Sequence, residues 1–96
     1  MKVVYSEQAL RDLAKLRSFI AGRNPDAAAS VAAALVERLE NLGRFPRLGR
    51  AAGRAPEPEA LRDVVFGNYI VRYAPRTDVV IVLRIWHHYE DRGASR

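Results

Sequence analysis

The sequence predicts an α+β fold in which a helical hairpin packs on a largely antiparallel four-stranded sheet, in the order β-α-α-β-β-β. Two amphipathic segments with helical periodicity occupy most of the first half of the 96-residue chain. A short apolar segment precedes them, and three segments rich in β-branched and aromatic residues follow in the second half. The chain is long enough for one modest core and too short for two. We therefore expect a single domain over residues 1–96.

The beginning of the chain predicts an edge strand followed by a helix. Residues 2–5 are mostly apolar and are expected to form the strand. Ser6 is a good N-cap for a helix over residues 7–21, and Gly22 is a typical residue at a helix end. Apolar side chains near helical spacing predict the buried face of this helix: Leu10, Leu13, Leu16, Phe19 and Ile20.

A second helix is predicted to begin immediately after Asn24. Asparagine is a favoured N-cap, and Pro25 suits the first helical position because its missing N–H would have no partner there. Asp26 would lie near the positive end of the helix dipole, and Gly43 is expected to close the helix. The apolar stripe predicts core packing and consists of Ala28, Val31, Ala32, Leu35, Leu39 and Leu42.

The second half of the chain predicts a long loop and then three strands. Residues 44–60 lose all periodicity and contain several glycines and prolines, which is typical of a functional or mobile loop. Residues 61–66 and 69–74 are expected to be strands joined by a tight turn at Gly67 and Asn68. The apolar run from 79 to 85 predicts a strand that is covered on both faces.

This last strand leads into a cluster of ionisable side chains. Period-two alternation predicts that one face carries Val80, Val82, Arg84, Trp86 and His88. The other face is then expected to carry Val79, Ile81, Leu83, Ile85 and His87. Tyr89 follows at the exit of the strand, so a rigid element would present groups suited to anion binding or proton transfer.

The composition favours an acidic or polyanionic partner. The chain has 16 Lys and Arg residues against 11 Asp and Glu residues, a formal charge of +5 and a pI near 10.2. Most of the excess lies after residue 43, and Arg50 belongs to a run of arginines with no acid among them. No apolar run of about 18 residues is present, so we expect a cytoplasmic protein with no membrane partner.

Several chemistries are disfavoured. The chain has no cysteine, which excludes disulfides, cysteine metal ligands and thiol catalysis. His87 and His88 point to opposite faces of a strand, and no third ligand lies at a suitable spacing. We therefore expect neither a metal nor another cofactor. The serines lie at a cap, on helices and in the tail, away from any nucleophile elbow, and no glycine-rich phosphate loop is present.

Three arginines remain as candidates for a functional site. Arg62, Arg72 and Arg84 lie on the three consecutive strands and could cradle a phosphodiester, while His88 and Tyr89 could move protons during cleavage by a 2′-hydroxyl. The alternative is structural. In that case Arg62 pairs with an acid among Asp63, Glu90 and Asp91, and His87 packs beneath the helices as a hydrogen-bonded core histidine.

Over residues 1 to about 92 the chain resembles the RelE/ParE superfamily of bacterial type II toxins, also called plasmid-stabilisation proteins. The order and spacing of several short motifs carry the resemblance: Ser6-Glu7-Gln8-Ala9, Asp12-Leu13, Asn24-Pro25, Phe45-Pro46, Gly49-Arg50, Leu61-Arg62, Gly67-Asn68-Tyr69-Ile70-Val71-Arg72-Tyr73, Val82-Leu83-Arg84-Ile85-Trp86-His87 and Glu90-Asp91-Arg92. The resemblance implies the same fold and a toxin that stops growth until a cognate acidic antitoxin neutralises it, in complexes that can assemble further.

The resemblance leaves the target open among three alternatives. The long helical hairpin and the Arg-Ile-Trp-His run look more like ParE members, which inhibit DNA gyrase. RelE-like members cut mRNA on the ribosome, and that alternative would make Arg62, Arg84, His88 and Tyr89 catalytic. A third alternative is a non-toxic member that only binds its antitoxin. In either toxic case, the residues expected to support toxicity or target binding are Arg50, Arg62, Arg72, Arg84, His87 and Arg92.

Overall fold

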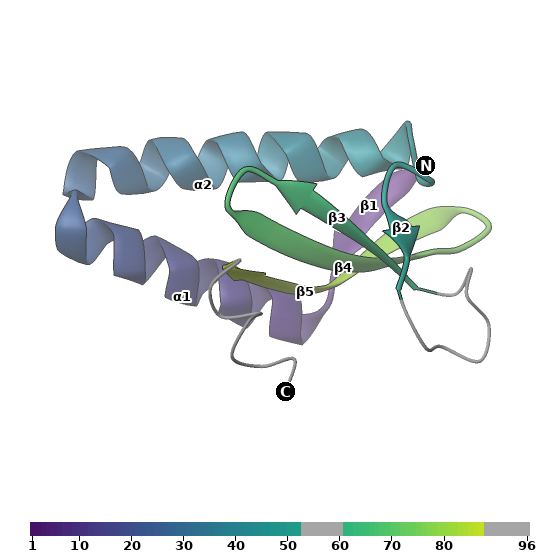
Figure 1. Ribbon diagram of the computed structural model, residues 1–96, viewed down its shortest axis with the longest axis horizontal. Coiled ribbons are helices and arrows are strands. Elements are labelled where there is room, and N and C mark those ends of the chain that lie inside the picture. Colours follow the sequence, from purple (N-terminus) through teal and green to yellow (C-terminus); the bar gives the residue numbers. More distant parts are fainter. Residues whose placement is uncertain (53–60, 88–96) are drawn as a thin grey trace.

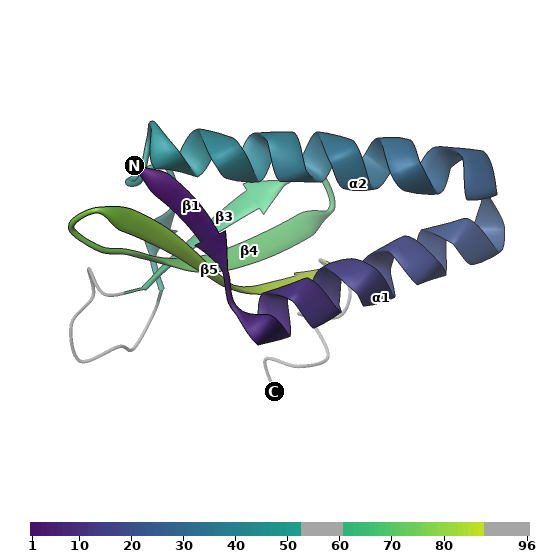
Figure 2. The ribbon, with the colours of Figure 1, turned by 180° about the vertical axis from the view of Figure 1, so that it is seen from behind.

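A helical hairpin covers one face of a mixed five-stranded sheet in the computed structural model, which describes residues 1–52 and 61–87 (Figures 1 and 2). The elements in chain order are β1 (Lys2–Tyr5), α1 (Glu7–Arg23), α2 (Pro25–Glu40), the 3-10 helix η1 (Asn41–Gly43), β2 (Arg50–Ala51), β3 (Arg62–Phe66), β4 (Tyr69–Pro75) and β5 (Val79–His87). The strand order is β1-β5-β4-β3-β2. Strand β1 runs parallel to β5 at one edge, and the remaining pairs are antiparallel.

The predicted α+β class is confirmed, with one more strand than expected. Arg50 and Ala51 form the short strand β2, which pairs with Asp63 and Arg62 of β3. Two residues of the expected 44–60 loop therefore extend the sheet. No helix within the described residues is long and apolar enough to cross a membrane.

Local signals correctly place both helices. The Ser6 side chain accepts a hydrogen bond from the backbone N–H of Ala9 at 3.0 Å and so caps α1. Asn24 serves both helices, since its backbone N–H donates to Ile20 O at 2.7 Å and its side chain accepts from the N–H of Ala27 at 3.2 Å. Helix α1 consequently runs to Arg23, and the prediction that Gly22 ends it is wrong.

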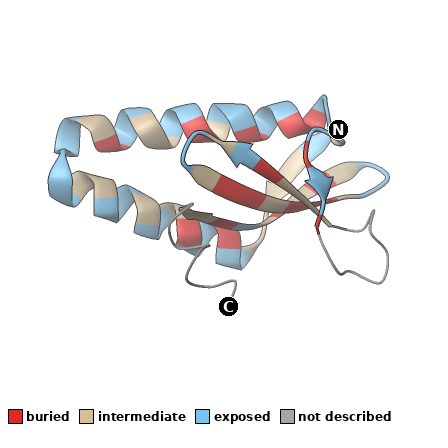
Figure 3. Ribbon diagram, in the orientation of Figure 1, coloured by how far each residue is buried: buried red, intermediate tan, exposed pale blue. Residues whose placement is uncertain are grey.

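The buried face of α1 is narrower than predicted. The buried positions are Ala9 and Asp12, both in the first half of the helix. Leu10 and Phe19 were expected in the core but are 54% and 63% exposed. Burial is concentrated where the hairpin covers the sheet, and the end of the hairpin with its turn extends beyond the sheet (Figure 3). This overhang accounts for Phe19 but not for Leu10, which lies in the first turns of α1.

The core lies between α2, the start of α1 and the strands, and Tyr73, Leu39, Leu42, Val71, Val80 and Val82 are its largest fully buried side chains. The predicted stripe of α2 supplies Ala28, Leu35 and Leu39, and Leu42 follows in η1. Gly43 is needed for space, because a Cβ there would clash with the backbone carbonyl of Met1. The chain therefore continues past α2 as a 3-10 turn tight against β1.

A bulge in β5 changes the predicted alternation of the last strand. Arg72 pairs with Arg84 and Tyr73 pairs with Val82, so Leu83 has no opposite residue on β4. Val80 and Val82 are buried before the bulge, and Ile85 is buried after it. The prediction that Arg84 shares a face with Val82 is therefore wrong, since Arg84 turns away from the core that Ile85 enters.

The hairpin turn between β3 and β4 agrees with the prediction. Gly67 has a φ of 61°, and no other described residue has a positive φ. A positive φ at the first of two turn residues fits a type II′ turn, whose twist suits a two-residue hairpin.

Tyr73 attaches the segment before β2 to the core. Its hydroxyl donates to Pro46 O and accepts from the N–H of Gly49, both at 2.8 Å, and its ring is fully buried. Gly49 lies so close to β3 that an added Cβ would be 2.5 Å from Asp63 O. One buried hydroxyl thus holds two backbone groups of this segment in place.

Replacing Tyr73 by Phe should lower the free energy of unfolding by about 1–3 kcal/mol, because a buried N–H and a carbonyl lose their partner while the ring still fills the core. Urea denaturation measures this change. Tyr69→Phe is the matched control and should change stability by less than about 0.5 kcal/mol. Equal losses in both variants would contradict the role assigned to the Tyr73 hydroxyl.

Candidate functional site

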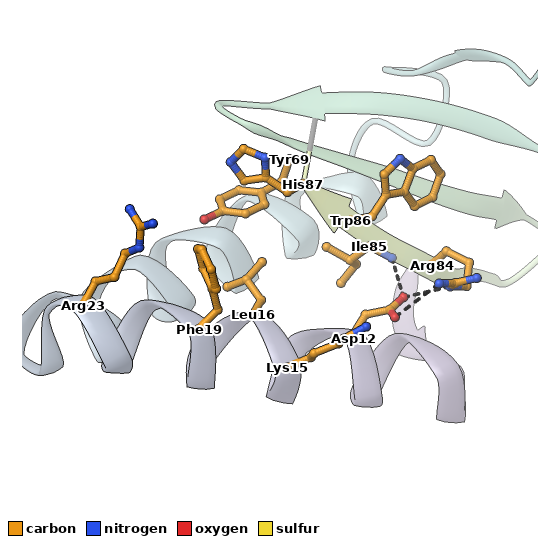
Figure 4. A pocket seen from close by; sticks show the side chains of 10 residues that line it. All are labelled: Asp12, Lys15, Leu16, Phe19, Arg23, Tyr69, Arg84, Ile85, Trp86 and His87. Carbon is orange, nitrogen blue, oxygen red and sulfur yellow. Dashed lines mark hydrogen bonds and ion pairs between the residues drawn. The ribbon is translucent and has the colours of Figure 1, made fainter. Parts of the chain in front are cut away.

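An open groove lies between α1 and the end of β5 (Figure 4). Its volume is about 610 Å³. Strand β1 pairs with β5 only as far as Val82, so the following edge of β5 faces α1 instead of another strand. The lining comprises Asp12, Lys15, Leu16, Phe19 and Arg23 from α1, Tyr69 from β4, and Arg84, Ile85, Trp86 and His87 from β5.

The α1 residues of this lining follow a single helical stripe. Asp12, Leu16 and Phe19 are spaced by four and three residues, which places them on one side of the helix. Arg23 continues this stripe four residues after Phe19, Lys15 lies beside it, and both add positive charge. Of the residues predicted for the buried face of this helix, Leu16 and Phe19 line the groove, whereas Leu13 and Leu16 pack against the core.

Asp12 joins the helix to β5 through its carboxylate. Its Oδ2 accepts hydrogen bonds from the backbone N–H of Ile85 at 2.8 Å and from Arg84 Nε at 2.9 Å, and Gln8 donates to Oδ1 at 3.3 Å. Burial alone would raise the pKa of Asp12. The hydrogen bonds from Arg84, Ile85 and Gln8, with the positive charge of Arg84, outweigh burial and hold the pKa below its usual value.

Arg84 presents a charged edge at the groove. Its Nε donates to Asp12 Oδ2 at 2.9 Å and one terminal nitrogen donates to Asp12 Oδ1 at 3.5 Å, while the side chain is 50% exposed. The ion pair fixes the direction of the planar guanidinium, whose remaining N–H groups suit a carboxylate or a phosphate. Asp12 is therefore a positioning residue for Arg84.

A row of charges crosses the sheet on the face away from the helices. Asp63, Arg72 and Arg84 are neighbours across β3, β4 and β5. Arg72 binds both oxygens of Asp63, at 2.9 and 3.0 Å, and its guanidinium lies 5.4 Å from the centroid of the Trp86 ring. Acidic partners therefore offset the repulsion between the two adjacent arginines.

Arg62 does not join this row. It pairs with Tyr73, so its side chain leaves β3 on the opposite face from Arg72. Its Nε donates to Gly49 O at 2.9 Å, and a terminal nitrogen donates to Arg47 O at 3.4 Å. The structure thus brings Arg72 and Arg84 together and separates them from Arg62, which supports the segment that leads into β2.

The other predicted site residues are dispersed. Arg50 lies exposed on β2 opposite Asp63. His87 is half-buried at the end of the groove, with its ring edge-on to Tyr69 at a centroid distance of 5.4 Å. Three predicted residues lie outside the described residues, namely His88, Tyr89 and Arg92. Residues 1–52 and 61–87 contain no group of three side chains that could hold a metal ion.

The sequence interpretation missed the groove itself. Phe19 was placed in the core, and Asp12, Lys15 and Arg23 were given no functional role. A signal for Asp12 does exist, because an acidic residue falls in the apolar stripe between Ala9 and Leu16. Such a residue in a buried stripe indicates a specific partner, here the N–H of Ile85.

Comparison with known proteins gives consistent results. Residues 3–92 match the family model of the ParE toxin of the type II toxin–antitoxin system parDE. Toxin RelE1 of Caulobacter vibrioides is 35% identical over 92 residues, which cover 94% of this chain and 96% of that protein. Toxin RelE3 of the same organism is 34% identical over 89 residues, with coverages of 88% and 91%.

Two solved structures share the fold. One is the chromosomal ParDE system of P. aeruginosa, with a TM-score of 0.77, 17% identity and coverages of 91% and 95%. The other is the toxin–antitoxin complex RelBE2 of Mycobacterium tuberculosis, with a TM-score of 0.67, 28% identity and coverages of 90% and 88%. These findings confirm the predicted superfamily.

Asp12 should stabilise the protein in a pH-dependent manner. Because folding lowers its pKa, its contribution is complete above the pKa of an unfolded aspartate, about 3.9, and is lost as the pH falls through the folded-state value. Asp12→Asn should therefore be less stable than the parent at pH 7, and the difference should narrow in acid. Asp12→Ala should lose about 1–3 kcal/mol more, because the Ile85 N–H loses its acceptor.

Urea denaturation between pH 7 and pH 3 measures both effects, with Glu37→Gln on the exposed face of α2 as the control. A constant difference between parent and Asp12→Asn across this range would show that the carboxylate charge contributes nothing.

Proposed function

Because the chain belongs to the ParE toxin family of type II toxin–antitoxin systems, we propose that it stops growth by binding DNA gyrase and that a cognate acidic antitoxin neutralises it. We expect it to act in the cytoplasm, where gyrase works. The relatives carry both ParE and RelE names, so the choice of gyrase as the target is argued from the site below.

The separation of Arg62 from Arg84 supports gyrase inhibition over RNA cleavage, because the cleavage alternative requires both arginines to act together. Cleavage by a 2′-hydroxyl needs a proton acceptor, a proton donor and charge stabilisation at one phosphate. Arg62 lies on the face opposite Arg72 and Arg84, and His87 contacts Tyr69 in the groove. The carboxylates that bind the two adjacent arginines are those of Asp63 and Asp12, so both acids are already engaged in ion pairs.

The arginine row is well suited to binding. Arg72 is held by Asp63 and by the Trp86 ring, and Arg84 is held by Asp12. Side chains that are fixed before a partner arrives lose less conformational entropy on binding. Arginine and tryptophan are also the residue types that most often dominate the binding energy of an interface.

Ribosome-dependent cleavage of mRNA is the second candidate. It is favoured by the RelE names of the curated relatives, which are 33–35% identical to this chain. It would depend on Arg62, Arg84, His88 and Tyr89 acting together, as the resemblance implies.

The purified chain should abolish negative supercoiling by purified gyrase. Expression of the chain in cells without antitoxin should leave mRNA intact. Arg84→Ala should weaken gyrase inhibition about tenfold, as expected when an arginine at the centre of an interface is truncated. Arg38→Ala, on the exposed face of α2, is the matched control and should inhibit like the parent. A supercoiling assay and 5′-end mapping of mRNA on translating ribosomes provide the two measurements.

The opposite pattern would reverse the choice of target. Cuts within codons that disappear in Arg84→Ala or Tyr89→Phe, with gyrase still active, would establish the ribosomal mechanism. Neither effect, together with antitoxin binding, would leave only the non-toxic alternative.

A further inference from the structure

Residues 44–50, which we call the arginine turn, lead from η1 into the edge strand β2. We propose that the arginine turn binds duplex DNA, with its exposed apolar side chains in the minor groove and its arginines on the flanking phosphates. This activity goes beyond the proposed function and does not depend on whether gyrase or the ribosome is the target.

The arginine turn interleaves cations with large apolar side chains. Its sequence is Arg-Phe-Pro-Arg-Leu-Gly-Arg, and the chain has no acid from residue 41 to residue 52. Arg44, Arg47 and Arg50 recur at every third position, and all three are exposed. Phe45 and Leu48 are 59% and 53% exposed. Cations interleaved with an exposed aromatic side chain are typical of surfaces that bind nucleic acid.

The two exposed apolar residues lie at the ends of one β-turn. The N–H of Leu48 donates to Phe45 O at 3.0 Å. Pro46 occupies the second position of this turn, where the fixed φ of proline is favoured. The Cα atoms at the ends of a β-turn are less than about 7 Å apart. The exposed side chains of Phe45 and Leu48 therefore leave the backbone close together.

The backbone of the arginine turn is held from the core. The buried hydroxyl of Tyr73 binds Pro46 O and the N–H of Gly49, both at 2.8 Å. Arg62 donates from Nε to Gly49 O at 2.9 Å and from a terminal nitrogen to Arg47 O at 3.4 Å. These hydrogen bonds fix the turn before a ligand arrives and so reduce the entropic cost of binding. Arg62 is thus a positioning residue of the arginine turn.

The charge of the arginine turn differs from that of the arginine row on the sheet. In the row, Arg72 and Arg84 are each paired with a carboxylate. Asp63 lies opposite Arg50, but both of its oxygens accept hydrogen bonds from Arg72. The sequence from residue 41 to residue 52 contributes three positive charges and no negative one. Such a concentration of like charge favours a polyanion as the partner.

The minor groove of B-form DNA matches the shape of the turn. It is about 6 Å wide, which admits a narrow turn, and its negative potential attracts arginine. Phenylalanine and leucine are among the side chains that proteins insert there between base steps. A-form RNA instead has a wide, shallow minor groove and a major groove too narrow for side chains to read. The arginine turn therefore fits duplex DNA better than duplex RNA.

The arginine turn lies apart from the groove described above. Strand β2 forms one edge of the sheet, and β3 and β4 separate it from β5, which lines the groove (Figure 1). DNA at the arginine turn would therefore leave the groove between α1 and β5 open.

Fluorescence anisotropy of a labelled A·T-rich DNA duplex with the full-length chain tests the proposal. Phe45→Ala should weaken binding about tenfold, as is typical when an aromatic side chain stacked on a base is removed. Arg44→Ala should weaken binding and reduce the slope of log affinity against log salt by about 1, because one phosphate contact is lost. Leu10→Ala and Arg38→Ala, on the exposed faces of the two helices, are the matched controls and should bind like the parent.

The possible results decide both the site and the ligand. Binding that is weakened by Phe45→Ala and Arg44→Ala, but not by the two control substitutions, supports the proposal. Equal affinity of the parent for an RNA duplex of the same sequence would overturn the assignment to the DNA minor groove. A parent that does not bind DNA, or equal losses in all four variants, would overturn the site. Gyrase and ribosomes do not enter this assay, so its failure would leave the proposed target unaffected.

Discussion

A hydrogen bond of 2.8 Å between the backbone N–H of Ile85 and the carboxylate of Asp12 fixes α1 against the edge of β5, where β1 no longer covers it. A free strand edge usually pairs with another chain or is protected by some other device. Here a helix supplies the acceptor that a neighbouring strand would have supplied. The same carboxylate also binds Arg84, so one side chain both covers the strand edge and orients the arginine. The groove lies next to this contact, between α1 and β5.

The bulge at Leu83 determines what this contact presents to solvent. Ser6 binds two successive carbonyls of β5, with its N–H on Val82 O and its hydroxyl on Leu83 O, both at 2.9 Å. Two successive carbonyls can face one partner only where the alternation of the strand is interrupted. Without the interruption, Arg84 would continue the buried face of Val82 and Ile85 would point outward. Ser6 therefore links the start of α1 to the face on which Arg84 emerges.

The predictable parts of the fold depend on residues that are close in sequence. Ser6 and Asn24 begin their helices through contacts three residues away, and Gly67 shapes the turn in which it lies. The bulge at Leu83 and the strand at Arg50 depend on partners far along the chain, and neither carries a local signal. The same limit applies to the site. The sequence identified Arg72 and Arg84, but only strand register and the bulge reveal that they are neighbours and that Arg62 lies on the other face.

Arg84 and Trp86 belong to both candidate surfaces of the molecule. They line the groove, while on the sheet Arg84 lies opposite Arg72 and Trp86 stacks under its guanidinium. A ligand carboxylate bound to Arg84 in the groove would cancel charge at one end of the arginine row, and the bound ligand would cover the Trp86 edge. A target that needs the row could then no longer bind with full affinity. Occupation of one site would thus weaken binding at the other, because the two sites share residues of one strand.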